Sequence, residues 1–500
     1  MSEPFYITTA ISYPNGRPHI GHAYEAIAAD AIARFQRSKG RDVKLVTGTD
    51  EHGLKMVQAA RADGRPTLEY ADEMSSYFRQ MCDQLNISYD AFVRTSEERH
   101  HAASIALWKA MEAAGDLYLD RYEGWYSVRD EAFYDESELV GAEGGERLSP
   151  QGTPVEWTAE ETWFFRLSRY QDRLLALYRD HPDFIRPEGR RNEVIRFVEG
   201  GLRDLSVSRT SFDWGVPVPG SPGHVMYVWV DALTTYMTGV GFPEQDGEYA
   251  RYWPADVHLI GKDIVRFHAV YWPAFLMSAG LPLPSQVFGH GFLLARGEKM
   301  SKSLGNVVDP MALASHFGVD PLRYFLLREI SFGQDGSYSA DAIVTRCNAE
   351  LANSFGNLAQ RSLSLIFKNL DGIIPSPGGA PDDLELLGVV EQACARLSAE
   401  FDRFAFAAGL EAWMSAVFAC NAYVDAQAPW ALKKTDPARM AEVLGTVVAA
   451  VKALALAIVP VVPESAGRLL DVIASGEGGL PIAQPTPIFP RLELPKDDEA

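Results

Sequence analysis

The sequence predicts an α/β protein in which a parallel sheet carries an insertion and is followed by a helical bundle. A strand–turn–helix–strand pattern opens the chain, and buried strand patterns resume after about residue 220. From Asp341 onward, apolar residues instead recur at three- and four-residue steps, which is typical of helices. A length of 500 residues agrees with a division into several domains.

The first parallel unit runs from residue 5 to residue 53. Residues 5–11 are rich in aromatic and β-branched side chains, which predicts a buried strand, and residues 13–18 follow as a turn. A helix is expected from about His19 to Ala33, and a second strand at residues 43–48. Because ligands of parallel sheets bind beyond the carboxyl ends of the strands, we expect a site at residues 14–22 and 48–53.

The middle of the chain has a different texture. Aromatic and polar residues alternate over residues 118–134, and residues 141–154 are rich in glycine. We therefore expect a smaller insertion at 116–219 within a sheet domain formed by residues 1–115 and 220–290. Further strands are expected at residues 225–230, 257–261 and 287–289.

A helical domain is expected over residues 341–500, after a connecting region at 291–340. A break rich in proline and glycine at 371–383 ends its first helix, and alanine-rich helices follow around 384–424 and 437–458. The tail from Ser475 is expected to pack as a strap. The apolar face of the first helix consists of Ile343, Cys347, Leu351, Phe355, Leu358 and Ser362.

Composition excludes several classes of protein. The formal net charge of -21 argues against a protein that coats nucleic acid by charge, although local recognition of RNA stays open. No apolar run reaches the ~18–20 residues that span a bilayer, and the N-terminus lacks a secretory pattern. We therefore expect a cytoplasmic protein with no membrane partner. The four cysteines form no CxxC pair.

Two short motifs carry the chemistry. His19 and His22 flank Gly21 at the expected helix start, where unpaired backbone N–H groups favour anions. Far downstream, Lys299 and Lys302 have the same i, i+3 spacing in a run that also contains Met300, Ser301 and Ser303. Taken singly, the first motif is equally well a helix start with satisfied histidines, and the second a solvated basic loop. Together on a parallel sheet, they indicate an ATP site where a carboxylate attacks the α-phosphorus.

These two segments are similar to the signature pair of the class I aminoacyl-tRNA synthetases. Further stretches resemble the methionyl-tRNA synthetases, namely residues 8–16, 48–53, 227–233, 261–268, 357–361 and 426–430. The resemblance covers nearly the whole chain. It implies a class I Rossmann-like parallel sheet with an inserted connective domain, followed by an all-α anticodon-binding bundle. It also implies a methionine–tRNA ligase, which converts L-methionine and ATP to methionyl-adenylate and pyrophosphate, and then charges tRNA(Met).

The resemblance also assigns roles in the activation step. His19 and His22 would stabilise charge on the α-phosphate, and Lys299 and Lys302 charge on the β,γ end of ATP. Mg²⁺ should accompany ATP as charge compensation. The remaining ATP contacts implied by the resemblance are Gly21, Lys262, Asp263, His290, Gly291, Met300, Ser301 and Ser303.

Methionine is an uncharged thioether, so its pocket should be apolar and aromatic. By resemblance, Asp50 receives the substrate ammonium, and His268 or Tyr13 supplies a polar contact near the sulfur. Leu233 departs from relatives that carry proline there. Taken singly, Trp229 and Tyr236 indicate core packing, and it is the resemblance that assigns them to the pocket. The full set of implied wall residues is Ile11, Tyr13, Trp229, Ala232, Leu233, Tyr236, Ile264 and His268.

Asn357 and Arg361 share a helix face, and Trp430 follows a proline at another helix start. By resemblance these three read the CAU anticodon; alternatively, Trp430 anchors the bundle and Arg361 is a surface charge. An arginine-rich stretch before the sheet resumes either guides the acceptor stem or pairs with Glu188, Glu193 and Glu199. Its members are Arg186, Arg190, Arg191, Arg196, Arg203 and Arg209.

Many methionyl-tRNA synthetases carry cysteine pairs in the insertion. Here Ser127 and Asp130 stand about where one pair would lie, and no cysteine occurs between Cys82 and Cys347. We therefore expect no structural zinc, with aromatic packing by Trp125, Tyr126, Phe133 and Tyr134 in its place. The sequence shows no appended C-terminal β-barrel, which favours a monomer.

Two rival functions are weighed against this one. A small nucleotidyltransferase shares the histidine motif but needs neither the insertion nor the bundle. A non-catalytic tRNA-binding relative should have lost signature residues, and this chain keeps both sets.

Overall fold

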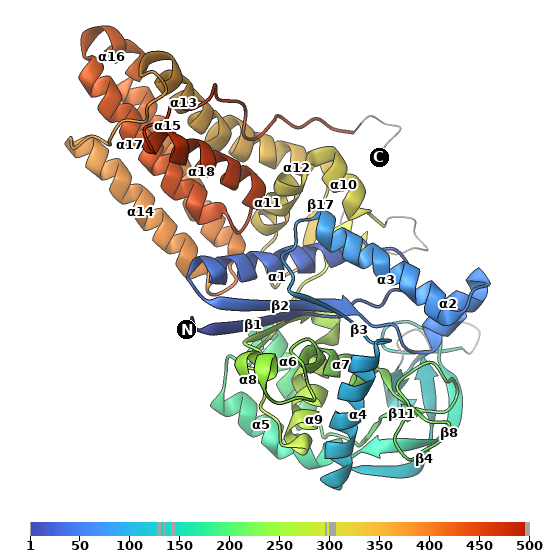
Figure 1. The fold of residues 1–500 in the computed structure, drawn as a ribbon. Coiled ribbons are helices and arrows are strands. Elements are labelled where there is room, and N and C mark those ends of the chain that lie inside the picture. Colours follow the sequence, from blue (N-terminus) through green and yellow to red (C-terminus); the bar gives the residue numbers. More distant parts are fainter. Residues whose placement is uncertain are drawn as a thin grey trace. The chain divides into compact units, whose positions relative to one another are not determined.

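The computed structural model describes residues 2–127, 132–134, 136–141, 146–295, 298–299 and 307–495. By its internal contacts the chain divides into two compact units (Figure 1). The first unit comprises residues 1–18, 40–83 and 88–290, and the second comprises residues 19–39, 84–87 and 291–500.

A six-stranded parallel sheet forms the centre of the first unit. Its order is β3 (Ala91–Arg94), β2 (Asp42–Thr49), β1 (Pro4–Thr9), β13 (Val257–Gly261), β14 (Val287–His290) and β9 (Ile185–Arg186). β1 pairs with β2 on one side and with β13 on the other, so the strand order reverses there. Such a switch point opens a crevice at the carboxyl ends of the strands. The sequence predicts a site there, at residues 14–22 and 48–53.

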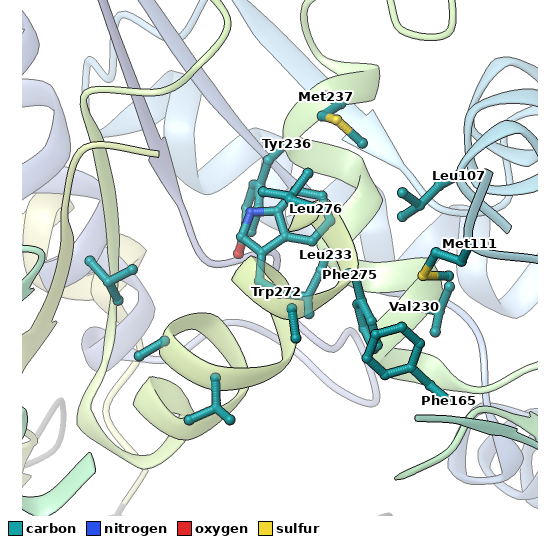
Figure 2. Close-up of a cluster of buried hydrophobic side chains, with 14 of the residues drawn as sticks. Leu107, Met111, Phe165, Val230, Leu233, Tyr236, Met237, Trp272, Phe275 and Leu276 are labelled. Atoms are coloured by element: carbon teal, nitrogen blue, oxygen red, sulfur yellow. The ribbon is translucent and has the colours of Figure 1, made fainter. Parts of the chain in front are cut away.

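Helices α4 (Glu98–Ala113), α7 (Val228–Thr238) and α9 (Trp272–Ala279) pack against one another beside the sheet (Figure 1). Their apolar side chains form one core, in which Leu233 and Tyr236 of α7 lie with Trp272 and Phe275 of α9 (Figure 2). The other helices of this unit are α2 (Leu54–Asp63), α3 (Thr67–Gln84), α5 (Gln171–Asp180), α6 (Glu188–Glu199) and α8 (Gly247–Tyr252).

The expected strand at residues 225–230 is wrong beyond its first two residues. Only β12 (Val225–Met226) is a strand, paired with β11 (Ser208–Arg209), and α7 begins at Val228. Valine and tryptophan favour strands, but that preference is weak. It is overridden because α7 buries Val230, Leu233, Tyr236 and Met237 in the core.

The insertion is built on a long antiparallel pair. β4 (Leu117–Ser127) pairs with β8 (Glu156–Phe165), flanked by β5 (Ala132–Tyr134) and β10 (Leu205–Ser206). Within the segment in which aromatic and polar residues alternate, residues 117–127 and 132–134 are therefore strands. A small hairpin, β6 (Val140–Gly141) with β7 (Arg147–Leu148), lies between them in the chain.

The second unit begins with α1 (Ile20–Ser38), which runs five residues beyond the expected end at Ala33. Asp30 of α1 pairs with Arg323 of α11 (Val319–Glu329) at 2.6 Å, and both side chains are fully buried. Arg323 also donates to three backbone carbonyls, those of Leu85, Pro460 and Val461. A buried arginine satisfied in this way fixes α1 against α11. α10 (Pro310–Phe317) precedes α11.

The expected helical bundle forms the rest of this unit. The six residues assigned to one helix face, from Ile343 to Ser362, are all buried. They lie on α12 (Ala340–Cys347), a π-helix at Asn348–Gly356 and α13 (Asn357–Asn369). The wider turn of the π-helix explains why four-residue steps predominate in this face. The bundle continues with α14 (Pro381–Phe401), α15 (Phe406–Gln427), α16 (Pro429–Thr435), α17 (Pro437–Ile458) and α18 (Pro463–Glu477).

α17 is long and apolar enough to cross a membrane, but 61% of its most apolar stretch is buried inside the protein, as in a core helix. The tail after α18 packs along the bundle as a strap. Asn348 exchanges two hydrogen bonds with the Leu492 backbone, and Phe489 lies against Phe355.

Candidate active site

The N-terminus of α1 is capped by its two histidines. Nδ1 of His19 accepts the Gly21 N–H at 3.1 Å, and Nδ1 of His22 accepts the His19 N–H at 3.1 Å. The rings stack with centroids 3.8 Å apart. Because each Nδ1 is an acceptor, each neutral ring carries its proton on Nε2. Both rings therefore present an N–H donor at the positive end of a helix, as an anion site requires.

The start of α1 also lies beside the segment that follows the lysine motif. The Ile20 N–H donates to the Val308 carbonyl at 3.0 Å. Lys299 ends β16 (Glu298–Lys299), which pairs with β15 (Leu293–Ala295); β15 also pairs with β17 (Gly336–Tyr338). Met300, Ser301, Lys302 and Ser303 lie outside the described residues.

In the first unit, Asp50 follows β2 and is only 6% exposed. Its neighbour Glu51 is fully buried and accepts hydrogen bonds from the side chains of Arg94, Thr49 and Ser96. The Glu51 backbone donates to Thr95 and accepts from the Trp214 indole. These bonds fix the backbone that carries Asp50, a requirement for a carboxylate that must hold an ammonium group.

Ile11 and Tyr13 follow β1, at the switch point of the sheet. Ser12 between them forms a parallel bridge with Thr49. The Tyr13 hydroxyl accepts the Met56 N–H at 3.1 Å, and the Lys55 ammonium lies 5.2 Å from the Tyr13 ring centroid. Tyr13 is therefore anchored at the start of α2, on the carboxyl side of the sheet.

Four of the predicted wall residues share one face of α7. Trp229, Ala232, Leu233 and Tyr236 have the i, i+3, i+4, i+7 spacing of a single helical face. Trp229 stacks on Phe267 with ring centroids 3.7 Å apart. Leu233 is 1% exposed and belongs to the core shown in Figure 2. Of these four residues, Trp229 lines a cavity of the first unit, whereas Ala232, Leu233 and Tyr236 are buried.

His268 and Tyr236 form a neutral polar pair in this wall. The His268 Nδ1–H donates to the Ile264 carbonyl at 2.9 Å, and Nε2 lies 2.6 Å from the Tyr236 hydroxyl, which donates to it. Both side chains are 2% exposed. Burial lowers the pKa of His268 to about 4. The pair is therefore uncharged at neutral pH, as an uncharged substrate side chain requires.

The pKa of His268 predicts a pH dependence of stability. Its folded pKa of about 4 lies below the ordinary 6.5, so the unfolded chain binds the proton first as pH falls. This contribution to the free energy of unfolding is complete above pH 6.5 and is lost between pH 6.5 and 4, by about 3 kcal/mol in total. Urea unfolding of wild type and His268→Gln at pH 7 and pH 5 measures it. We expect wild type to lose more stability than the variant; an equal loss would contradict the assignment.

The expected ATP contacts fall at strand ends. Lys262 and Asp263 begin a 3-10 turn after β13, and the Asp263 carboxylate lies back over Gly261, 2.8 Å from where a Cβ would stand. His290 ends β14 and is 6% exposed. At Gly291 a Cβ would lie 2.1 Å from the Gln334 carbonyl oxygen, so no side chain fits there.

The sequence did not indicate a role for three buried residues, Asp231 of α7 and its partners His52 and His100. Asp231 of α7 is fully buried between His52 and His100. Burial alone would raise the pKa of Asp231, but the charges and hydrogen bonds of both histidines outweigh it and lower that pKa. A lone carboxylate inside the apolar run at 228–233 is a signal that would have indicated Asp231.

A cavity of about 570 Å³ in the first unit reaches Trp229. Arg196, Arg203, Arg209 and Arg266 contribute to its wall, with two carboxylates, Glu138 and Asp204. The remaining arginines follow the structural alternative: Arg186, Arg190 and Arg191 pair with Asp183, Glu193 and Glu188. Aromatic rings of Phe197, Tyr227, Trp229, Phe267 and Tyr271 complete the cavity wall.

Hydroxyl groups meet at the end of β4, about where the resemblance would place a cysteine pair. The Thr153 hydroxyl lies 2.6 Å from that of Ser127 and 2.8 Å from that of Ser149, and all three residues are buried. Trp125 packs edge-on against Trp157. Asp130 lies outside the described residues, and the side chain of Phe133 is likewise not described. Within the described ranges, no cluster of His, Cys, Asp or Glu is arranged to hold a metal ion.

In the second unit, Arg361 and Trp430 come together. The Arg361 guanidinium lies 5.9 Å from the Trp430 ring centroid and 3.2 Å from the Asp425 carboxylate. Trp430 is 49% exposed, so it is a surface ring and not a bundle anchor. Asn357 is exposed at the start of α13, one turn before Arg361. An exposed indole beside a guanidinium is suited to stacking an unpaired base.

Two family models together cover most of the chain. Residues 5–144 and 146–363 match the family described as tRNA synthetases class I (M), and residues 375–486 match the anticodon binding domain of methionyl tRNA ligase. Methionine–tRNA ligases of Mycobacterium bovis and Rhizobium meliloti are each 56% identical over 99% of both chains. The fold is similar to that of Mycobacterium tuberculosis methionyl-tRNA synthetase in complex with methionyl-adenylate (TM-score 0.95, 56% identity, 98% and 100% coverage).

Proposed function

The chain belongs to the methionyl-tRNA synthetases of class I, and from this premise we propose how its residues carry the reaction. Its activity is that of a methionine–tRNA ligase. Methionine reacts with ATP to form methionyl-adenylate and pyrophosphate, and the methionyl group then passes to the 3′ end of tRNA(Met).

In the activation step, the substrate carboxylate attacks the α-phosphorus and negative charge grows on the phosphoryl oxygens. His19 and His22 stabilise that charge through their Nε2–H groups, because their Nδ1 atoms are occupied by the helix cap. This pair of capping bonds is the observation that carries the proposal. Lys299 and Lys302 balance charge on the departing pyrophosphate, and Mg²⁺ arrives with ATP. Asp50 holds the methionine ammonium, and the Trp229–Tyr236 face of α7 contacts the thioether.

Methionine-dependent exchange of labelled pyrophosphate into ATP tests the proposed function. We expect exchange with methionine and little with leucine, isoleucine, valine or cysteine. Exchange with one of these amino acids, but not with methionine, would reject the proposed substrate.

For the second step, we propose that the cavity beside Trp229 receives the 3′ end of the tRNA. Arginines provide phosphate contacts and aromatic rings provide stacking surfaces, which is the chemistry of single-stranded RNA binding. Arg266 already lies on the Phe197 ring, with its guanidinium 3.9 Å from the centroid. The cavity is a local basic site in a chain of net charge -21.

The double variant Arg196→Gln/Arg266→Gln tests this site. We expect about a tenfold or greater loss in single-turnover transfer from bound methionyl-adenylate, because two phosphate contacts are removed. Pyrophosphate exchange, which needs no tRNA, is the internal reference. Arg191→Gln removes an arginine that pairs with Glu188 and should transfer at the wild-type rate. Equal transfer rates in the double variant and wild type would reject the site.

We further propose that the insertion is stable without structural zinc, that the protein is a cytoplasmic monomer and that its tRNA carries a CAU anticodon. The hydroxyl cluster of Ser127, Ser149 and Thr153 supports the first point. Metal analysis that found one tightly held zinc per chain would contradict it. Light scattering, cell fractionation and charging of transcripts with altered anticodons test the other three.

A further inference from the structure

Asp231 connects the two parts of the proposed methionine site, the segment that contains Asp50 and helix α7. It lies on α7 between Trp229 and Ala232 but on the opposite face of the helix, where it is fully buried. Its Oδ2 lies 2.5 Å from His52 Nδ1, and its Oδ1 lies 2.6 Å from His100 Nε2. An ionised carboxylate can only accept, so both histidines donate to it.

The two histidines belong to different elements. His52 is two residues from Asp50, in the segment whose backbone is held at Glu51 by Thr95 and Trp214. His100 lies on α4, and its Nδ1 is 2.9 Å from the Thr238 hydroxyl, further along α7. One carboxylate therefore joins the Asp50 segment, α4 and the pocket helix.

A buried carboxylate held in this way contributes little net stability, because the cost of desolvating it offsets the hydrogen bonds that it accepts. It does fix geometry, since each oxygen of Asp231 has one partner at hydrogen-bond distance. Removing it leaves α7 packed by apolar contacts, which are non-directional and tolerate small shifts along the helix axis.

We propose that Asp231 is a positioning residue that sets the distance between the Asp50 carboxylate and the thioether wall on α7, and so determines which side-chain length the enzyme accepts. The inference rests on the proposed roles of Asp50 and α7. The substrate is held by its ammonium at Asp50 and by its sulfur at α7. Only a side chain whose length from the ammonium to the sulfur matches this distance can make both contacts. The residue does not touch the substrate; it acts through His52.

The test compares wild type with Asp231→Asn in pyrophosphate exchange. The substrates are methionine, homomethionine, which has one more methylene between the α-carbon and the sulfur, and S-methylcysteine, which has one fewer. One methylene is worth about 10–200-fold in a well-defined apolar pocket. We expect the preference in kcat/KM for methionine over both analogues to fall about tenfold in the variant, with a higher KM for methionine and an unchanged KM for ATP.

Asp116→Asn is the matched control. Asp116 is also a buried carboxylate of this unit, bonded to Ser278 and Arg169, and it contacts none of the proposed pocket residues in the described contacts. It should lower thermal stability as Asp231→Asn does, yet leave the analogue preference unchanged. The inference is overturned if Asp231→Asn and Asp116→Asn both lower stability without changing the preference for methionine. It is also overturned if both variants reduce that preference equally.

Two substitutions at His52 decide the question if Asp231→Asn does not fold. His52→Asn places an amide N–H near the position of Nδ1 and should retain the preference for methionine, whereas His52→Ala should lose it. Equal behaviour of the two would overturn the inference. Wild type without methionine-dependent exchange would instead reject the proposed function, so the two failures are distinguishable.

Discussion

Replacing either capping histidine with asparagine should lower kcat for methionine-dependent pyrophosphate exchange by about 10²–10³-fold, the effect of removing one preorganised donor from a developing oxyanion. In His19→Asn and His22→Asn, the side-chain oxygen stands near the position of Nδ1. It can therefore still accept the backbone N–H that caps α1. The Nε2–H donor is lost. Exchange assays at saturating methionine and ATP, with thermal unfolding of the same samples, separate catalysis from folding.

The control for this prediction is His22→Gln, in which the longer amide brings an N–H closer to the position of Nε2. We expect it to recover part of the activity that His22→Asn loses. A variant that unfolds at a much lower temperature and regains activity on cooling would show that capping, and not charge stabilisation, is the role of the histidine. Wild-type kcat in both asparagine variants would remove these residues from the mechanism.

The sequence predicted the sheet, the helical bundle and the histidine motif at the start of α1, because these depend on local patterns. Residues 257–261 were expected to form a strand and β13 has those bounds. The strand expected at residues 225–230 ends at Met226, because β-favouring side chains cannot reveal that core packing will hold the following residues in a helix. The error has a functional consequence, since only a helix places Trp229, Ala232, Leu233 and Tyr236 on one face.

Side-chain contacts between residues far apart in the sequence could not be predicted either. His52 and His100 are separated from Asp231 by more than a hundred residues, and nothing local to either histidine indicates the pairing. In the same way, Arg196 and Arg191 look alike in the sequence, but one lines a cavity and the other pairs with Glu188. Tertiary contacts, which no periodicity encodes, divide the arginine-rich stretch into these two roles.

Trp430→Ala should reduce kcat/KM for tRNA charging about 10–100-fold while pyrophosphate exchange continues, because loss of one base–aromatic stack costs ~1–3 kcal/mol. The 49% exposed indole is available to stack, and Arg361 beside it can contact the base edge. Because the two side chains would hold the same base, Trp430→Ala/Arg361→Ala should lose less than the product of the single losses. Phe367→Ala removes another exposed aromatic residue, on the far side of α13 from Arg361, and should charge tRNA normally. If Trp430→Ala and Phe367→Ala behaved alike, the exposed indole would be an ordinary surface residue, and the anticodon would have to be read elsewhere on the bundle.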